Sequence, residues 1–208
     1  MSQQDQIHAL LAGVFLLCVV LGLQAYQMDR MRASVQHATE QVREARKSLQ
    51  EFQHRLETFE SRLDAEATEV ARVLVSETSR PSEMPYIAWV VRHRFKTGYG
   101  GATSYRDVVR QPWQFTGLSR ASSRQELHLG PARALRRHYG DRWIAAKEIA
   151  IDTLLSRRGS GPFGGRRVLH FYSPRSMPER YPSWIARMRP VASSLDSHRF
   201  TFLDHHDS

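Results

Sequence analysis

The sequence predicts a mainly α-helical protein with a transmembrane helix at its N terminus, a long coiled-coil helix and a C-terminal α-rich domain with little β-structure. Three observations lead to this prediction. An apolar run covers residues 7–26, a heptad repeat then continues to Val73, and short helical patterns separated by loops fill the remainder. We therefore divide the chain into a tail at 1–6, the transmembrane helix, a coiled-coil stalk at 27–75 and a domain at 76–208.

The apolar run from Ile7 to Tyr26 has about the length that a helix needs to cross a hydrocarbon core. The alternative is a cleaved signal peptide. However, the preceding segment MSQQDQ has no Lys or Arg, and no clear small-x-small cleavage pattern follows. We expect a retained anchor. Basic residues follow the run and none precedes it, so the positive-inside rule alone would put the C-terminal part in the cytoplasm.

Beyond the apolar run, apolar residues recur at alternating steps of three and four. Almost seven heptads without Pro or Gly predict a coiled coil and a homo-oligomer, because one strand cannot bury its own seam. The alternative is a long helix that folds back on its own domain. Glu66 is the one polar seam residue, and we expect the coil to open or change partners there. The seam positions are Met28, Met31, Val35, Ala38, Val42, Ala45, Leu49, Phe52, Leu56, Phe59, Leu63, Glu66, Val70 and Val73.

The domain is expected to contain short helices. Ser82 is a candidate cap for the first, with Pro85 in its first turn, and Ser104 with Asp107 forms a capping box for the second. Gly140 separates the last two helices. The expected helices are Met84–Arg94, a short one after Ser104 that ends near Gln111, Ala132–Tyr139 and Asp141–Arg157, followed by an extended segment at Val168–Pro174.

Charge is concentrated in the domain. Residues 76–208 hold 22 Lys/Arg against 11 Asp/Glu, whereas residues 1–75 hold 8 against 10. This balance favours an anionic partner, which could be nucleic acid, acidic lipid or an anionic polymer of a bacterial envelope. The domain has no nucleic-acid motif, and its aromatic residues are not interleaved with basic ones. We therefore do not expect nucleic acid to be the partner.

No motif predicts a metal or a cofactor. The lone cysteine, Cys18, lies in the apolar run and offers neither a disulfide framework nor a Cys-based metal site. His205 and His206 stand beside two aspartates, but adjacent residues in a terminal segment make poor metal ligands. The Gly-rich segment 157–167 matches neither a Walker A sequence nor a dinucleotide fingerprint.

Several separated segments of the domain carry residues in a distinctive order: Glu77; Ala88, Val90, Val91 and Arg94; Val108, Val109, Gln114 and Phe115; His170, Phe171, Tyr172 and Pro174; Trp184; His198 and Phe200. Together these segments resemble one family, the cell wall hydrolases related to spore cortex-lytic enzymes. The similarity covers about 130 residues, from the end of the stalk onward, and it implies a lysozyme-like fold of the lytic transglycosylase type. His93 stands where that family usually has Asn, and Arg167, Val168 and Leu169 replace its Gly-Ala-Thr type lead into the late aromatic segment.

The resemblance implies that Glu77 is the general acid of glycosidic bond cleavage, with an apolar surround that keeps it protonated near neutral pH. It implies that Gln114, Phe115, Tyr172 and Trp184 bind the sugar. Most glycosidases use a second carboxylate, and none is evident, because Glu83, Asp107 and Asp141 can all be surface or capping residues. A single acid fits a lytic transglycosylase, in which the substrate's own C6 hydroxyl closes a 1,6-anhydro ring. Hydrolysis of the muramidase type stays open.

The resemblance thus implies a membrane-anchored enzyme that cleaves the glycan strands of peptidoglycan, as in phage lysis or envelope remodelling. Its domain would lie on the cell-wall side of the membrane, against the local charge bias, or it would arrive from outside in a virion. The alternative is a non-catalytic virion or envelope assembly protein. In that case a lysozyme-like domain on a coiled-coil stalk binds glycan without cleaving it.

Overall fold

The computed structural model describes residues 3–111, 114–115, 118, 124–156, 161–164, 166–172, 185, 188–191 and 200–204. These residues are mainly helical with few strands, which confirms the expected fold class at this level. The chain divides into two compact units, Met1–Thr58 and Phe59–Ser208. We call the second of these the compact unit.

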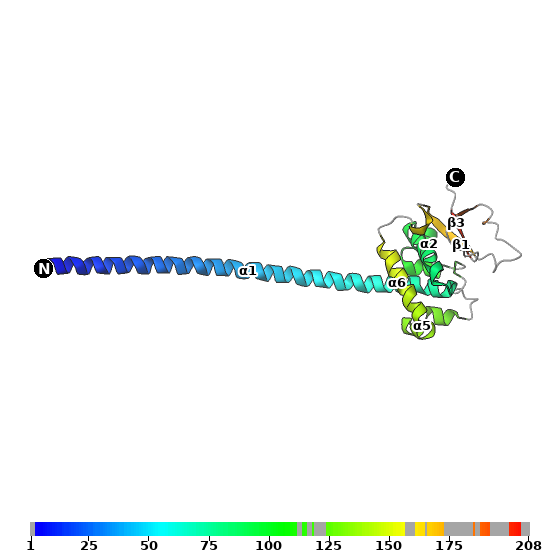
Figure 1. Cartoon of the computed structure of the whole chain (residues 1–208), viewed down its shortest axis with the longest axis horizontal. Coiled ribbons are helices and arrows are strands. Elements are labelled where there is room, and N and C mark those ends of the chain that lie inside the picture. The colour runs from blue at the N-terminus through cyan, green and yellow to red at the C-terminus, as the bar shows by residue number, and fades with distance from the viewer. Residues whose placement is uncertain are drawn as a thin grey trace. The chain divides into compact units, whose positions relative to one another are not determined.

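The first helix, α1, runs without interruption over Gln3–Glu77 (Figure 1). Its N-terminal part is long and apolar enough to cross a membrane by length and composition. The large apolar side chains described there are exposed; examples are Leu10, Phe15 and Leu16. Such a surface is suited to lipid rather than to water.

The last turns of α1 belong to the core of the compact unit. Ala67, Val70, Ala71, Val73 and Leu74 are each at most 1% exposed. We expected the stalk to extend to residue 75 and the domain to begin at 76, but the compact unit begins at Phe59. The stalk prediction is corrected here because these apolar positions pack inside the chain's own domain.

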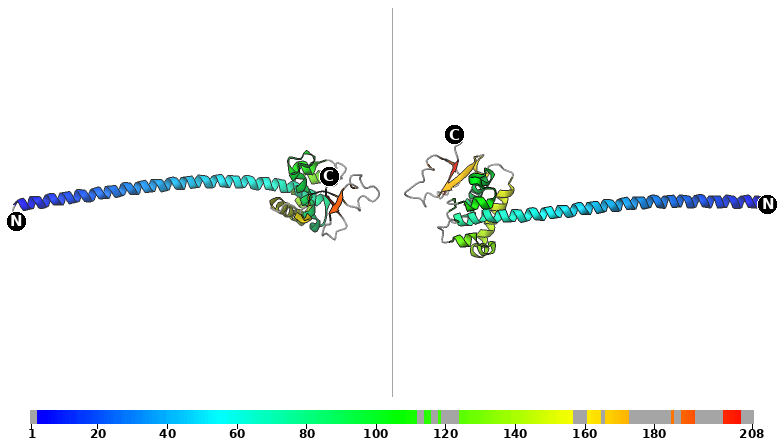
Figure 2. Two further views of the ribbon diagram at one scale, coloured as in Figure 1. Left: turned by 90° about the horizontal axis from the view of Figure 1, so that it is seen from above. Right: turned by 180° about the vertical axis from the view of Figure 1, so that it is seen from behind.

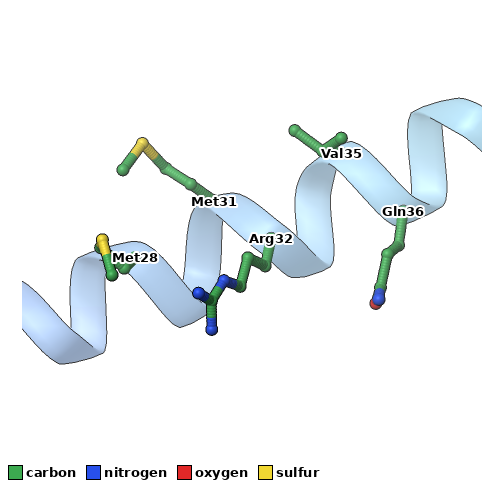
Figure 3. A pocket seen from close by; sticks show the side chains of 5 residues that line it. All are labelled: Met28, Met31, Arg32, Val35 and Gln36. Atoms are coloured by element: carbon green, nitrogen blue, oxygen red, sulfur yellow. The ribbon is translucent and has the colours of Figure 1, made fainter.

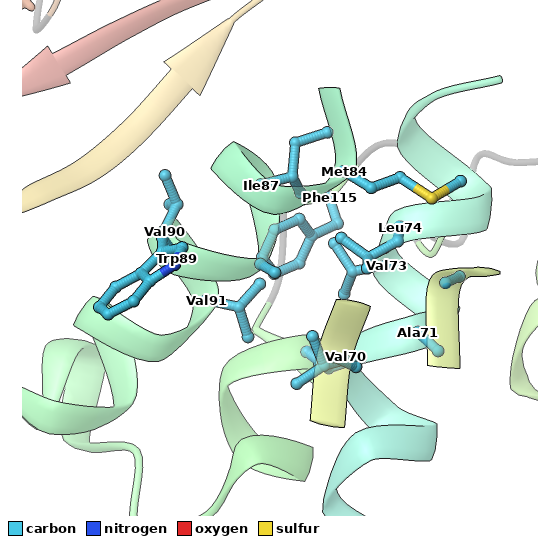
Figure 4. Packing of buried hydrophobic residues seen from close by; sticks show 14 of the residues in the cluster. Val70, Ala71, Val73, Leu74, Met84, Ile87, Trp89, Val90, Val91 and Phe115 are labelled. Atoms are coloured by element: carbon cyan, nitrogen blue, oxygen red, sulfur yellow. The ribbon is translucent and has the colours of Figure 1, made fainter. Parts of the chain in front are cut away.

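Two helices pack around this part of the core. Helix α2 covers Met84–Lys96 and α6 covers Asp141–Leu155. Figure 4 shows Val73 and Leu74 of α1 beside Met84 of α2 and the ring of Phe115. All four side chains are almost fully buried. The core therefore joins segments that lie far apart in the sequence.

Polar contacts also hold the end of α1 in the compact unit. Arg72 Nη1 donates to the carbonyl oxygens of His128 and Gly130, each at 2.6 Å. Lys147 Nζ lies 2.7 Å from Asp64 Oδ1, and Arg142 donates to the carbonyl oxygen of Val75. Burial lowers the pKa of Arg72, and the neighbouring Glu69 partly offsets this effect.

The helix starts agree with the sequence in part. Helix α3, Tyr105–Arg110, has Ser104 as its cap, because the Ser104 Oγ accepts from the Asp107 N–H at 3.1 Å. Ser82 is not the cap of α2: it is exposed inside a short 3₁₀ helix, and Glu83 takes the cap position without a side-chain bond. The other helical elements are η1 (Pro81–Glu83), η2 (Tyr99–Gly101), α4 (Gln125–Leu129), α5 (Ala132–Tyr139) and η4 (Gly161–Phe163).

A three-stranded antiparallel sheet completes the described fold. It consists of β1 (Val168–Tyr172), β2 (Arg189–Val191) and β3 (Thr201–Asp204), in the order β1-β3-β2. Strand β1 confirms the extended segment expected from residue 168. It packs against α2, as Figures 1 and 2 show. The pairing of β1 with β3 has an irregularity between Val168 and His170.

Candidate active site at the end of α1

Glu77 is the last residue of α1 and is half-buried. The helix stops because Pro81 follows closely, and a residue before proline is disfavoured in the α conformation. Arg80 accordingly has extended dihedrals, with φ −103° and ψ 116°. This local sequence puts a carboxylate at the point where the chain leaves the helix.

Arg94 of α2 is the charged group at the centre of the site. It is 2% exposed, and its Nε donates to the carbonyl oxygen of Leu169 at 2.6 Å. Its guanidinium lies 5.3 Å from the ring centre of Tyr99 and 5.1 Å from that of Phe115, so two aromatic faces hold it by cation–π attraction. Burial lowers the pKa of Arg94 to about 10, while Tyr99 and Glu77 act in the opposite direction.

Glu77 interacts with Arg94 and follows an apolar part of α1. The charge of Glu77 is the smallest of the three causes that act on the pKa of Arg94, and it favours the charged guanidinium. We expected an apolar surround for Glu77 that would keep it protonated. Val73, Leu74 and Val75, which precede Glu77 on α1, are each at most 2% exposed, and the buried Arg94 interacts electrostatically with Glu77.

A glycine-rich turn positions Tyr99 beside Arg94. Gly98, Gly100 and Gly101 all have positive φ, between 61° and 75°, where a side chain would be strained. The Gln111 side chain donates from Nε2 to the Tyr99 carbonyl oxygen at 2.6 Å and closes the turn. The Tyr99 ring meets the ring of His170 edge-on, with 5.3 Å between centroids. This segment is therefore a turn that a side-chain hydrogen bond holds in place.

The four residues expected to bind sugar differ in their surroundings. Phe115 is 2% exposed and packs against Phe171 at 6.3 Å between ring centres, so it is a core residue that supports the site. Gln114 and Tyr172 are half-buried, and Tyr172 ends β1 opposite Thr201. Trp184 lies outside the described residues, as do Pro174 and His198 of the similar segments.

Glu83 is a second carboxylate close in sequence to Glu77, but it is neither a surface residue nor a side-chain cap. It is 0% exposed and accepts a hydrogen bond from the Thr78 hydroxyl. The Thr78 Oγ1 in turn accepts from the Arg80 N–H at 3.0 Å, and the Arg80 guanidinium lies 3.8 Å from Glu83. This network fixes the turn that directly follows Glu77. The other two carboxylates that we considered, Asp107 and Asp141, are exposed.

His93 occupies the position where the similar family usually has Asn. It is buried, and its Nδ1 lies 3.1 Å from both the carbonyl oxygen and the amide nitrogen of Val168. A protonated Nδ1 donates to the oxygen, and an unprotonated Nδ1 accepts from the N–H. Either state of His93 therefore bonds α2 to the irregular start of β1.

Two features of the site were missed from the sequence. The importance of Arg94 could have been detected, because it continues the apolar face of α2 at a helical spacing from Ile87, Val90 and Val91. A charge on a buried face requires partners. The closure of the turn around Tyr99 by Gln111 has no comparable signal.

Within the described part of the chain, no group of three or more His, Cys, Asp or Glu side chains could hold a metal ion. His205 and His206 lie outside that part. No family model matches the chain, and neither the curated proteins nor the solved structures contain a significant match.

Proposed function

We propose that this protein is a membrane-anchored enzyme that cleaves glycosidic bonds in the glycan strands of peptidoglycan, with Glu77 as the general acid. The proposal rests on the resemblance to cell wall hydrolases. One structural observation supports it most directly: four separated segments of that resemblance converge on Arg94. Arg94 lies on α2 and contacts both the segment at Phe115 and β1, and the charge of Glu77 at the end of α1 also acts on it.

In this proposal Glu77 first donates its proton to the glycosidic oxygen as the bond to C1 breaks. The resulting carboxylate then accepts the proton of the C6 hydroxyl, whose oxygen attacks C1 and closes a 1,6-anhydro ring. If water attacks instead, the same carboxylate accepts a proton from the water, and the product has a reducing end. Glu83 is buried and bonded to Thr78, which favours the route with one carboxylate.

The anchor and the charge agree with this proposal. The apolar part of α1 would hold the protein in a membrane, and the exposed heptad seam beyond it would join copies into a homo-oligomer. The basic residues of the compact unit would attract the carboxylates of peptidoglycan stem peptides. The compact unit would then act on the cell-wall side of the membrane, either as a phage lysis or envelope-remodelling protein or after delivery in a virion.

A second candidate function is a non-catalytic structural or assembly protein that binds glycan. His93 favours it, because it stands where the similar family usually has Asn and is buried against Val168. The burial of Phe115 also removes one of the aromatic surfaces expected to contact sugar.

The test is the release of soluble muropeptides from purified peptidoglycan by the full chain in detergent micelles. Glu77→Gln is compared with Glu57→Gln, which changes an exposed glutamate of the same helix. We expect release by the wild type and by Glu57→Gln, and none by Glu77→Gln. Anhydro products identify a lytic transglycosylase, and reducing ends identify hydrolysis.

Equal release by Glu77→Gln would remove Glu77 from its proposed role. Absence of release by a folded wild type that still sediments with peptidoglycan would favour the structural protein.

A further inference from the structure

One face of α1 between Met28 and Phe59 has exposed apolar side chains at regular heptad spacing. Val35, Val42 and Phe52 are 63–69% exposed, and Ala38 and Ala45 are also exposed. Figure 3 shows the start of this face, a shallow groove lined by Met28, Met31 and Val35 with Arg32 and Gln36 beside them. An apolar stripe of this length on a helix requires a cover.

The compact unit sets the end of the available seam. Val70 and Val73 continue the heptad pattern, but they are buried in the chain's own core together with Ala67. A second helix could reach them only by displacing α2 and α6 from that core. The seam open to a partner therefore extends from Met28 to Phe59 and is shorter than the sequence pattern suggests.

Small and β-branched residues at the seam favour a coiled coil of two helices over one of three or four. With Met28 at position a of the heptad, Val35 and Val42 also fall at a, where β-branched residues favour dimers. Ala38 and Ala45 fall at d. Alanine fills little volume, so it closes a narrow core between two helices and would leave gaps in the wider core of three or four.

Charges at the edges of the seam favour a parallel pair of identical chains. Arg55 falls at position g and Glu60 at position e of the next heptad, which puts them opposite each other across a parallel dimer. The other g and e positions between residues 27 and 53 carry no acidic residue, so no like pair of carboxylates forms. A shared membrane at the N-terminal end also requires both helices to run the same way.

We propose that α1 forms a parallel, two-stranded coiled coil with a second copy of this chain over Met28–Phe59 and that this pairing ends before Ala67. The parallel direction rests in part on the proposed membrane anchor. The pairing itself is independent of peptidoglycan cleavage, so the two proposals can fail separately.

The test is disulfide cross-linking of the full chain in detergent micelles in a Cys18→Ser background. Cysteine replaces one alanine at a time. Ala38→Cys and Ala45→Cys lie on the seam, and Ala33→Cys lies on the opposite helix face as a matched control; all three sites are exposed in the single chain. In a parallel dimer each seam residue lies opposite the same residue of the second chain, at a distance that a disulfide can bridge.

With a mild oxidant, we expect near-complete cross-linked dimer from Ala38→Cys and from Ala45→Cys, and little from Ala33→Cys. Sedimentation in density-matched detergent should give the mass of two chains. An antiparallel pair would allow at most one of the two seam positions to meet itself, so cross-linking at only one site overturns the parallel arrangement. Equal cross-linking at all three sites, or a mass of one, three or four chains, overturns the proposal as a whole.

Discussion

The Arg94 side chain donates from Nε to the carbonyl oxygen of Leu169 at 2.6 Å, across a sequence separation of 75 residues. This bond joins α2 to β1 inside the compact unit, and the adjacent His93 bonds to Val168 of the same strand. Two neighbouring residues of one helix thus hold the first two residues of the strand. The site at the end of α1 is built on this connection.

Replacing Arg94 should destabilise the compact unit even when the charge is kept. Arg94→Lys retains a cation but cannot reproduce the bond from Nε to Leu169, and a buried carbonyl left without its partner costs about 1–3 kcal/mol. Urea denaturation followed by tryptophan fluorescence measures this loss. Arg106→Lys, at an exposed position of α3, is the control and should be neutral. A wild-type denaturation midpoint for Arg94→Lys would contradict the structural role.

Thr78→Val should also lower stability, because it removes the hydroxyl that donates to the fully buried Glu83. Valine has almost the same shape as threonine, so the change removes only the two hydrogen bonds of the hydroxyl, the one to Glu83 and the one from the Arg80 N–H. We expect a loss of about 1–3 kcal/mol in the free energy of unfolding. Thr78→Ser keeps the hydroxyl and should therefore retain most of the wild-type free energy of unfolding. If valine and serine behave alike, the hydroxyl does not stabilise Glu83.

Gly161→Ala should be more harmful than Gly164→Ala. Both glycines have positive φ, 53° and 60°, where alanine costs about 1–2 kcal/mol. A Cβ on Gly161 would also collide with ring atoms of Trp89, whereas a Cβ on Gly164 would meet open space. Overpacking of this kind adds about 1–3 kcal/mol. Thermal unfolding of the two variants should therefore differ by several degrees, and equal melting temperatures would contradict the close approach of Gly161 to Trp89.

Tyr105 should make the compact unit sensitive to alkali. Burial raises the pKa of Tyr105 to about 12 from the usual 10.0 of a tyrosine, an effect that Arg92 partly offsets. The folded state keeps the proton that the unfolded state releases above pH 10. The stabilisation is therefore complete below pH 10 and is lost between pH 10 and 12, by about 2–3 kcal/mol for a shift of this size.

Tyr105→Phe isolates this effect, since Arg94 titrates in the same range with the opposite sign. We expect the difference in unfolding free energy between wild type and Tyr105→Phe to change between pH 9 and pH 12. A difference that stays constant across this range would show that Tyr105 does not titrate differently in the two states.

The boundary of the compact unit can be tested with two fragments. Residues 59–208 retain the core side chains of α1, and residues 76–208 lack Val70, Val73 and Leu74, which are at most 1% exposed. Removing a single large core side chain costs about 2–5 kcal/mol, and a domain has only about 5–15 kcal/mol in total. We expect cooperative thermal unfolding by circular dichroism for the longer fragment only. Cooperative unfolding of residues 76–208 would instead support a domain that begins at residue 76, as we expected from the sequence.

Local signals predicted some elements well. The Ser104 cap and the bounds of α5 follow from capping and helical periodicity, which depend on neighbouring residues. The end of the stalk could not be predicted in this way. Val70 and Val73 satisfy both a heptad seam and a core-facing stripe, and periodicity does not identify the partner that covers them. Strands β2 and β3 are three and four residues long, and their pairing depends on residues far away in the sequence.

The sequence identified individual residues of the candidate site but not the contacts between them. Glu77 at a helix end and the segment at Phe115 were identified from the sequence. The burial of Glu83 and the aromatic contacts of Arg94 depend on long-range packing, which no local pattern encodes.

The strand order has a consequence for synthesis on the ribosome. Strand β3 is central, and in the described sheet β1 and β2 each pair only with β3. It is also the last of the three to be translated. After β1 has been translated, more than 25 further residues must follow before β3 is synthesised. Translation proceeds at about 5–20 residues per second, so β1 has no strand partner for that time. During that interval β1 is an open strand edge in the nascent chain, exposed to chaperones and to wrong pairing.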